Sequence, residues 1–184
     1  MIGFLILVLL LAAFYGGARR GTSLQLVSVL GYLFSFFVAV AKYQSLAKKI
    51  ELYVPYMSVT ADSKLVFYDP ELALDLDKAY YAAVAFIMIL FAGWLVTKLI
   101  CIFADGLRFK RLRFLKGYDW VAAGILNTVL AYINIYFFLM ILSMIPLATI
   151  QNLFDKSSTA HFIVESSPII SNYFYRLWIT NVIG

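Results

Sequence analysis

Four apolar runs, each close to the length of a membrane span, constrain most strongly how this chain can fold. They cover about residues 2–18, 22–41, 79–104 and 121–147. A transmembrane helix needs about 20 consecutive apolar residues, and in lipid a helix satisfies its own backbone polar groups. The composition agrees, because 64% of the residues are hydrophobic and only 14% are charged. The sequence therefore predicts an all-α integral membrane bundle of four transmembrane helices.

The first run could be mistaken for a secretory signal peptide. No positive charge precedes it, no A-x-A-like cleavage site follows it, and Arg19 and Arg20 come after its apolar core. A signal peptide carries its positive charge before the apolar core and its cleavage site after it. We therefore expect this segment to remain as the first membrane helix.

The remaining segments predict a long outer loop and a helical tail. We expect residues 1–149 to form the four-span domain, with residues 42–78 as its outer loop. In the tail, residues 150–184, Ser157 or Ser158 can cap a short helix and Pro168 can begin a second one. The second helix is too short to span a bilayer, so we expect an amphipathic segment that lies in the interface or packs on the bundle.

The positive charges predict an orientation. They concentrate in the short loops after the first and third runs, at Arg19, Arg20, Arg108, Lys110, Arg111, Arg113 and Lys116. Such residues favour the cytoplasmic side, whereas basic residues on the other side are sparser and are offset by acids. We expect the N-terminus outside, the two basic loops in the cytoplasm and the C-terminus outside. The second basic loop could also bind anionic lipid headgroups, at about 1 kcal/mol per basic residue.

The turn between the first two runs reads YGGARRG at residues 15–21. Two positive charges are what a cytoplasmic turn needs, so the stretch can be interpreted as a hinge. The glycines on either side also suit a tight re-entry with exposed backbone donors. We therefore name Gly17, Arg19, Arg20 and Gly21 as a candidate functional turn.

The second and fourth runs carry small and polar residues at helical spacing along one face. The candidate polar residues are Gln25, Ser28, Ser35, Asn127 and Asn134. One interpretation is helix packing, since amide and hydroxyl groups hydrogen-bond between helices in lipid. The other is a polar path for a solute. No ionisable residue lies deep inside any run, which disfavours ion-coupled transport.

Other function classes receive little support. The chain has one cysteine, Cys101, and one histidine, His161, too few for a zinc site built from Cys and His. No G-x-S-x-G, P-loop, H-E-x-x-H or dinucleotide fingerprint occurs, so we expect no enzyme activity, cofactor or metal. The net charge of +5 resides in loops beside apolar runs, which favours a topology signal over nucleic-acid binding.

Three segments follow one another along the chain: the first run with YGGARRG, LDLDKAYYAAVAFIMILFAGWLVTKLI, and IPLATIQNLFDKSSTAHFIVESSPIISNYFYRLWI. In this order they resemble the colicin V production protein family, including members from lactic acid bacteria. The most characteristic matches are Arg20-Gly21 and the tail motif Ser166-Ser167-Pro168. Many members carry an acidic residue near the start of the first span. This chain has no charged side chain before Arg19, so any role of that acid does not transfer.

The resemblance implies a small polytopic protein of the bacterial inner membrane, linked to colicin V production or export and to envelope function. Its implied partners are membrane lipids, with other membrane proteins, an export system or self-association as further candidates. We expect a non-enzymatic accessory or scaffold. The alternative is a small channel or carrier that uses the polar faces of the second and fourth spans.

Overall fold

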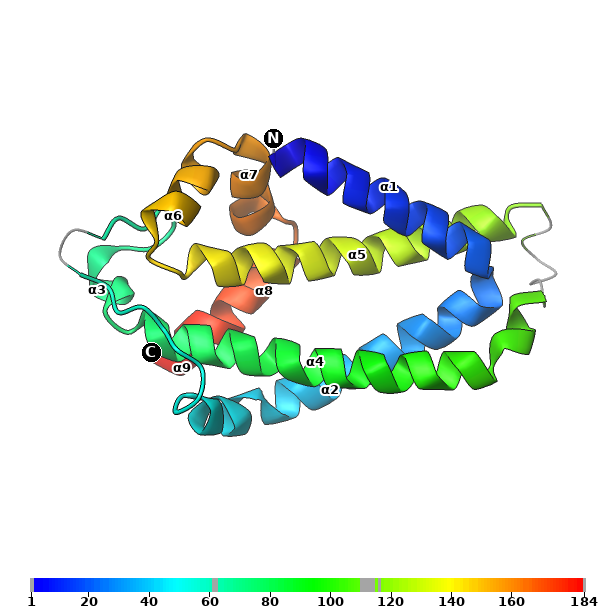
Figure 1. The fold of residues 1–184 in the computed structure, drawn as a ribbon, viewed down its shortest axis with the longest axis horizontal. Helices are drawn as coiled ribbons and strands as arrows, with labels where there is room; N and C mark the ends of the chain where they lie inside the picture. Colours follow the sequence, from blue (N-terminus) through cyan, green and yellow to red (C-terminus); the bar gives the residue numbers. More distant parts are fainter. Residues whose placement is uncertain (1, 61–62, 110–114, 116, 184) are drawn as a thin grey trace. The chain divides into compact units, whose positions relative to one another are not determined.

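The computed structural model describes residues 2–60, 63–109, 115 and 117–183. In this part of the chain every regular element is a helix, which confirms the all-α prediction (Figure 1). The chain divides into two compact units. Unit 1 comprises Met1–Gly3, Ala41–Ile87 and Ile135–Gly184, and unit 2 comprises Phe4–Val40 and Met88–Asn134.

Four long helices contribute residues to both units: α1 (Ile2–Arg20), α2 (Thr22–Ile50), α4 (Leu76–Phe103) and α5 (Asp119–Ser143). Among the described residues, these four are long and apolar enough to cross a membrane. Many large apolar side chains on them are exposed, including Phe4 at 74%, Phe34 at 72% and Ile102 at 69%. Exposed apolar area of this extent indicates a partner other than water, and lipid is the partner that the helix lengths fit.

Two helix ends differ most from the predicted span ends. Helix α2 continues beyond residue 41 to Ile50, and α5 ends at Ser143 instead of reaching residue 147. The early end of α5 follows from Pro146, which has no N–H to donate and disfavours helical geometry at the residue before it.

The shorter elements lie between or after the long helices. They are α3 (Pro70–Ala73), η1 (Asp105–Phe109), α6 (Ala148–Asp155), α7 (Ser158–Ser166), α8 (Ile170–Tyr175), the π-helical turn η3 (Arg176–Thr180) and α9 (Asn181–Ile183). Ser157 caps α7 as predicted, since its side chain accepts a hydrogen bond from the Ala160 N–H at 3.4 Å. The second tail helix begins at Ile170 and not at Pro168, because Ile169 has a φ of 68° and interrupts the helix.

Aromatic side chains form the core of unit 1. Phe174 of α8 lies 4.6 Å from Phe137 of α5 and 4.9 Å from Trp178 of η3, measured between ring centroids. Phe86 of α4 is 5.4 Å from Trp178, whose side chain is fully buried. The tail therefore packs on the bundle within this unit, which is one of the two arrangements that the sequence left open.

Gln151 of α6 satisfies backbone groups at the end of α5. Its Nε2 donates to the carbonyl oxygens of Ser143 at 3.0 Å and Ile145 at 2.8 Å. Its Oε1 accepts from the N–H of Val66 at 3.0 Å. The last carbonyls of a helix have no partner within the helix. The buried Gln151 amide therefore connects the end of α5, helix α6 and the loop before α3.

In unit 2, α2 and α4 approach closely because each offers a glycine to a small polar residue of the other. Gly93 of α4 lies against Ser35, and Gly31 of α2 lies against Thr97, with no room for a Cβ atom at either glycine. The hydroxyls of Ser35 and Thr97 donate to carbonyls of their own helices. This arrangement satisfies the polar groups and is typical of helix packing in lipid.

Candidate functional site

The turn of the predicted functional motif is made by a single residue. Helix α1 ends at Arg20, α2 begins at Thr22, and Gly21 between them has a φ of 77°. A residue with a Cβ rarely adopts this conformation, and glycine does so at little cost. Gly21 therefore shapes the re-entry, as the sequence suggested.

Gly17 has a different role from the one expected for it. It lies inside α1, and a Cβ at this position would come 2.5 Å from both the Ala123 carbonyl oxygen and the Asn127 Cβ. This is the contact between α1 and α5, where a side chain would force the backbones apart. Gly17 is a packing residue and not part of the turn itself.

The backbone donor at the turn is also not exposed. The Thr22 N–H donates to Oδ2 of Asp119 at 3.2 Å, and the Thr22 hydroxyl donates to the Asp119 carbonyl at 2.6 Å. Both residues are buried. Sequence reasoning missed Asp119, although an acid immediately before an apolar run is a recognisable sign of a helix start.

The polar faces of α2 and α5 meet through two amides. Gln25, fully buried, donates from Nε2 to the Asn127 Oδ1 at 3.1 Å. Asn127 in turn donates from Nδ2 to the Ala13 carbonyl of α1 at 2.6 Å. This three-residue network, which we call the amide relay, links three helices of unit 2. It corresponds to the helix-packing interpretation of these two residues.

The other residues of the predicted polar face lie in different environments. The Ser28 hydroxyl is 3.4 Å from both the Leu24 carbonyl oxygen and the Cys101 sulfur. Ser35 packs against Gly93. Asn134 is exposed and donates to the Leu130 carbonyl of its own helix at 2.7 Å. The five candidates therefore do not form one continuous hydrogen-bonded path.

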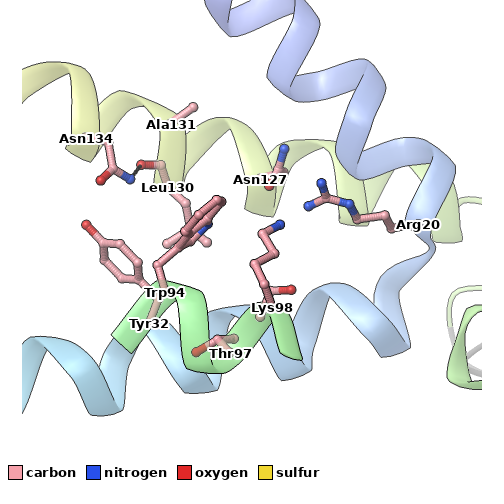
Figure 2. A pocket seen from close by; sticks show the side chains of 10 residues that line it. Arg20, Tyr32, Trp94, Thr97, Lys98, Asn127, Leu130, Ala131 and Asn134 are labelled. Carbon is pink, nitrogen blue, oxygen red and sulfur yellow. Dashed lines mark hydrogen bonds between the residues drawn. The ribbon is translucent and has the colours of Figure 1, made fainter. Parts of the chain in front are cut away.

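A cavity of about 150 Å³ lies in unit 2, and all four long helices line it. Its wall consists of Arg20, Ser28, Tyr32, Trp94, Thr97, Lys98, Asn127, Leu130, Ala131 and Asn134. Figure 2 shows the charged ends of Arg20 and Lys98 pointing into it on the side of Asn127, with Tyr32 and Asn134 at the other end. The cavity is thus cationic at one end and aromatic and amide-lined at the other.

A second, wider cavity of about 550 Å³ shares Arg20, Ser28 and Lys98 with the first. Its other lining residues are Gly16, Arg19, Leu24, Cys101, Ile102 and Asp105. The Lys98 ammonium lies 5.2 Å from the centroid of the Trp94 ring, a cation–π distance. The place of Lys98 beside the same cavities as Arg20 depends on the tertiary fold.

The two arginines of the turn are not equivalent. Arg19 is exposed, and its guanidinium donates to the Tyr15 hydroxyl at 3.3 Å on its own helix. Arg20 is partly buried and lines both cavities. Of the two, only Arg20 therefore faces the inner cavity that all four long helices line.

The tail motif forms the turn between α7 and α8. Ser166 is the exposed last residue of α7, and the buried Ser167 donates from Oγ to the Ile163 carbonyl at 2.6 Å. The Pro168 carbonyl accepts from the Ile170 N–H at 2.8 Å. These contacts are local, and the three residues line neither cavity described above.

The candidate lipid-binding loop falls largely outside the described residues. Lys110, Arg111, Arg113 and Lys116 are not described, and Arg108 is described only as part of the η1 backbone. The described residues contain no cluster of three His, Cys, Asp or Glu side chains that could hold a metal. The Nδ1 atom of His161 lies 3.0 Å from Oε2 of Glu165, and both side chains are substantially exposed.

Comparison with known proteins places the chain in a family. The sequence profile of the colicin V production protein family matches residues 2–168. The chain is also 25% identical to the uncharacterized transmembrane protein YshB of Bacillus subtilis (strain 168), over 97% of each chain. No solved structure matches it. With its four long apolar helices, this multi-pass membrane protein belongs to the colicin V production protein family.

Proposed function

We propose that the protein is a non-enzymatic accessory or scaffold of the bacterial cytoplasmic membrane. It supports production or secretion of a colicin-like peptide toxin or, more broadly, envelope homeostasis. Its basic turn faces the cytoplasm, and its N- and C-termini face outward. It acts with membrane lipids and with other membrane proteins, an export system or a second copy of itself.

The amide relay is the observation that carries this proposal. Gln25 and Asn127 are two of the three amides of the predicted polar face. They bond to each other, and Asn127 also bonds to α1. Ser35 is likewise packed against a glycine of α4. Polar groups used in this way hold helices together, which supports a stable platform more than a path for solutes.

The second candidate function is a small channel or carrier. It is favoured by the 150 Å³ cavity, because Ser28, Asn127 and Asn134 all line it. A water molecule occupies about 30 Å³ in the liquid, so the cavity has room for a small polar group. The five residues of the predicted polar face do not form a continuous hydrogen-bonded path. We therefore favour the accessory role over the carrier role.

The deciding experiment has two arms. In the first, the gene is deleted from a toxin-producing bacterium that encodes it, and secreted toxin activity and envelope permeability to a dye are measured with and without complementation. In the second, purified protein is placed in liposomes, and uptake of a panel of ions and small solutes is recorded. An accessory restores the first phenotype and produces no flux in the second.

One variant distinguishes the accessory from the carrier in both arms of the experiment. Asn134→Ala removes an exposed cavity amide that donates to the Leu130 carbonyl of its own helix, so an accessory should tolerate it while a carrier should lose flux. Solute uptake by the purified protein alone, reduced by Asn134→Ala, would establish the carrier and overturn the accessory proposal. A deletion strain with normal secretion and a normal envelope would overturn the proposed function as a whole.

A further inference from the structure

Two cations face shared space in unit 2. Arg20 comes from the end of α1 and Lys98 from α4, and both line the inner and the wider cavity. Among the described residues, no carboxylate lies within ion-pair distance of either of them. Asp105 lines the wider cavity only, and it makes no ion pair with them there.

This arrangement is costly without a counter-ion. A charged side chain inside a membrane-spanning segment carries an energetic penalty, and such residues usually pair with an opposite charge. Two like charges beside one cavity also repel each other. The Trp94 ring below the Lys98 ammonium offsets part of the cost for that residue, but Arg20 receives no comparable contact among the described residues.

The rest of the wall shows what kind of anion would fit. Beyond the two cations, the inner cavity is lined by the aromatic and apolar side chains of Tyr32, Trp94, Leu130 and Ala131. The remaining lining residues, Ser28, Thr97, Asn127 and Asn134, supply hydroxyl and amide groups. Trp94 is 43% exposed on the surface of α4. The cavity therefore combines two cations and several hydrogen-bonding groups with an aromatic and apolar wall at Trp94 and Leu130. This lining suits a molecule that has an anionic polar headgroup and an apolar chain.

We propose that Arg20 and Lys98 bind the phosphate of an anionic phospholipid, with its glycerol and acyl portion lying along Trp94 and Leu130. The guanidinium supplies two parallel donors to the phosphate oxygens, and the ammonium supplies the second charge. The site holds whether the protein is an accessory or a carrier, and it does not involve the basic loop that begins at Arg108. Basic pockets between transmembrane helices are suited to such headgroups.

The chain provides its own control. Arg19 carries the same charge in the same turn, but it is exposed and bonded to Tyr15. Arg19→Gln and Arg20→Gln therefore change the topology signal and the net charge equally. They differ in whether a cation is removed from the inner cavity.

The test uses purified full-length protein in a neutral detergent. It is titrated separately with phosphatidylglycerol, phosphatidylcholine and inorganic phosphate, and the thermal midpoint and the retained lipid are measured. A ligand that binds the folded state raises the midpoint. Phosphatidylglycerol should raise it, whereas phosphatidylcholine and inorganic phosphate at equal concentration should not.

The variants test which basic residues bind the lipid. Arg20→Gln and Lys98→Gln should each weaken phosphatidylglycerol binding about five-fold, and Arg19→Gln should leave it unchanged. Equal weakening by all three variants would mean attraction by general charge and would overturn the site. Equal shifts by inorganic phosphate and phosphatidylglycerol would assign the anion to soluble phosphate and overturn the lipid.

A second measurement needs no variant and so does not depend on folding of the glutamine forms. Cys101 lines the wider cavity together with Arg20 and Lys98. Phosphatidylglycerol should slow the reaction of Cys101 with a maleimide in the wild-type protein, and phosphatidylcholine should not. Identical rates in the two lipids would contradict occupation of this site.

Discussion

Asp119, the first residue of α5, accepts a hydrogen bond at 3.2 Å from the backbone N–H of Thr22, the first residue of α2. The carboxylate thus satisfies a donor that the start of α2 cannot satisfy itself. It lies near the positive ends of two helices, an environment that stabilises a negative charge. Two helix starts that are distant in sequence are thus joined beside the Gly21 turn, next to Arg19 and Arg20 at the end of α1.

We expect Asp119→Ala to lower the free energy of unfolding by about 1–3 kcal/mol, because the buried Thr22 N–H loses its acceptor. Asp119→Asn retains a carbonyl oxygen and should lose less. Titration with SDS in mixed micelles measures both values. Equal stability of the alanine variant and the wild type would show that this hydrogen bond does not stabilise the fold.

Two adjacent glycines in α1 should respond in opposite ways to alanine. At Gly17 a Cβ would meet the Ala123 carbonyl and Asn127 at 2.5 Å, whereas at Gly16 the nearest atom is the Asn127 Nδ2 at 3.9 Å. Gly17→Ala should therefore destabilise by about 1–3 kcal/mol through overpacking. Gly16→Ala should be neutral or stabilising by up to about 1 kcal/mol, because alanine favours helix. The same unfolding assay compares them, and equal effects would argue against close packing of α1 on α5.

The amide relay should show energetic coupling. In a double-mutant cycle, Gln25→Ala and Asn127→Ala should be non-additive by about 0.6–1.7 kcal/mol, the range for hydrogen bonds between membrane helices. The matched pair Gln25→Ala and Asn134→Ala should be additive, because Asn134 bonds to the Leu130 carbonyl on its own helix. Additivity in both cycles would mean that the contact between Gln25 and Asn127 contributes no net stability.

Alkaline pH should destabilise unit 1 through a tyrosine. Tyr56 donates from its hydroxyl to the Met144 carbonyl at 2.9 Å. Burial, with a smaller effect from Asp77, raises the pKa of Tyr56 to about 12. The folded protein therefore favours the neutral Tyr56 side chain. Its contribution to the free energy of unfolding is complete below about pH 10, the pKa of tyrosine in the unfolded chain. This contribution is lost as the pH rises toward 12. Burial also raises the pKa of Tyr68.

The measurement is unfolding in detergent from pH 8 to 11.5. Tyr56→Phe should be less stable than the wild type near neutral pH, because the Met144 carbonyl loses a donor. It should also lose less stability between pH 10 and 11.5. Tyr53→Phe is the control, since Tyr53 is 83% exposed. Parallel pH curves for the wild type and Tyr56→Phe would contradict this assignment.

Sequence periodicity could predict the helices and even the residues of the amide relay. Four apolar runs are long enough to require helices in lipid, and helical spacing places Gln25 and Asn127 on faces rich in small and polar residues. Their mutual contact depends on how α2 and α5 rotate about their axes, which spacing within one helix does not specify. The two predicted polar faces therefore meet at Gln25 and Asn127, whereas Asn134 is exposed.

Other features depend on tertiary structure and had weak local signals. Gly17 reads as part of a turn motif because Gly16 and Gly21 are close to it in sequence, and only the position of Ala123 shows that it is a packing glycine. Lys98 lines a cavity with Arg20, although the two residues are far apart in the sequence. The carboxylate of Asp119 finds its partner at a sequence separation that no local pattern reveals.

The proposed orientation can be tested with single cysteines in a Cys101→Ser background. Glu71→Cys lies in the predicted outer loop, and Gly106→Cys lies after α4 at an exposed position where an added Cβ meets no atom within 4 Å. In intact cells an impermeant maleimide should label Glu71→Cys only. After the membrane is opened it should label both, because Gly106 is expected on the cytoplasmic side with Arg19 and Arg20. Labelling of Gly106→Cys in intact cells, with Glu71→Cys protected, would reverse the orientation and place the turn and the proposed phosphate site at the outer face.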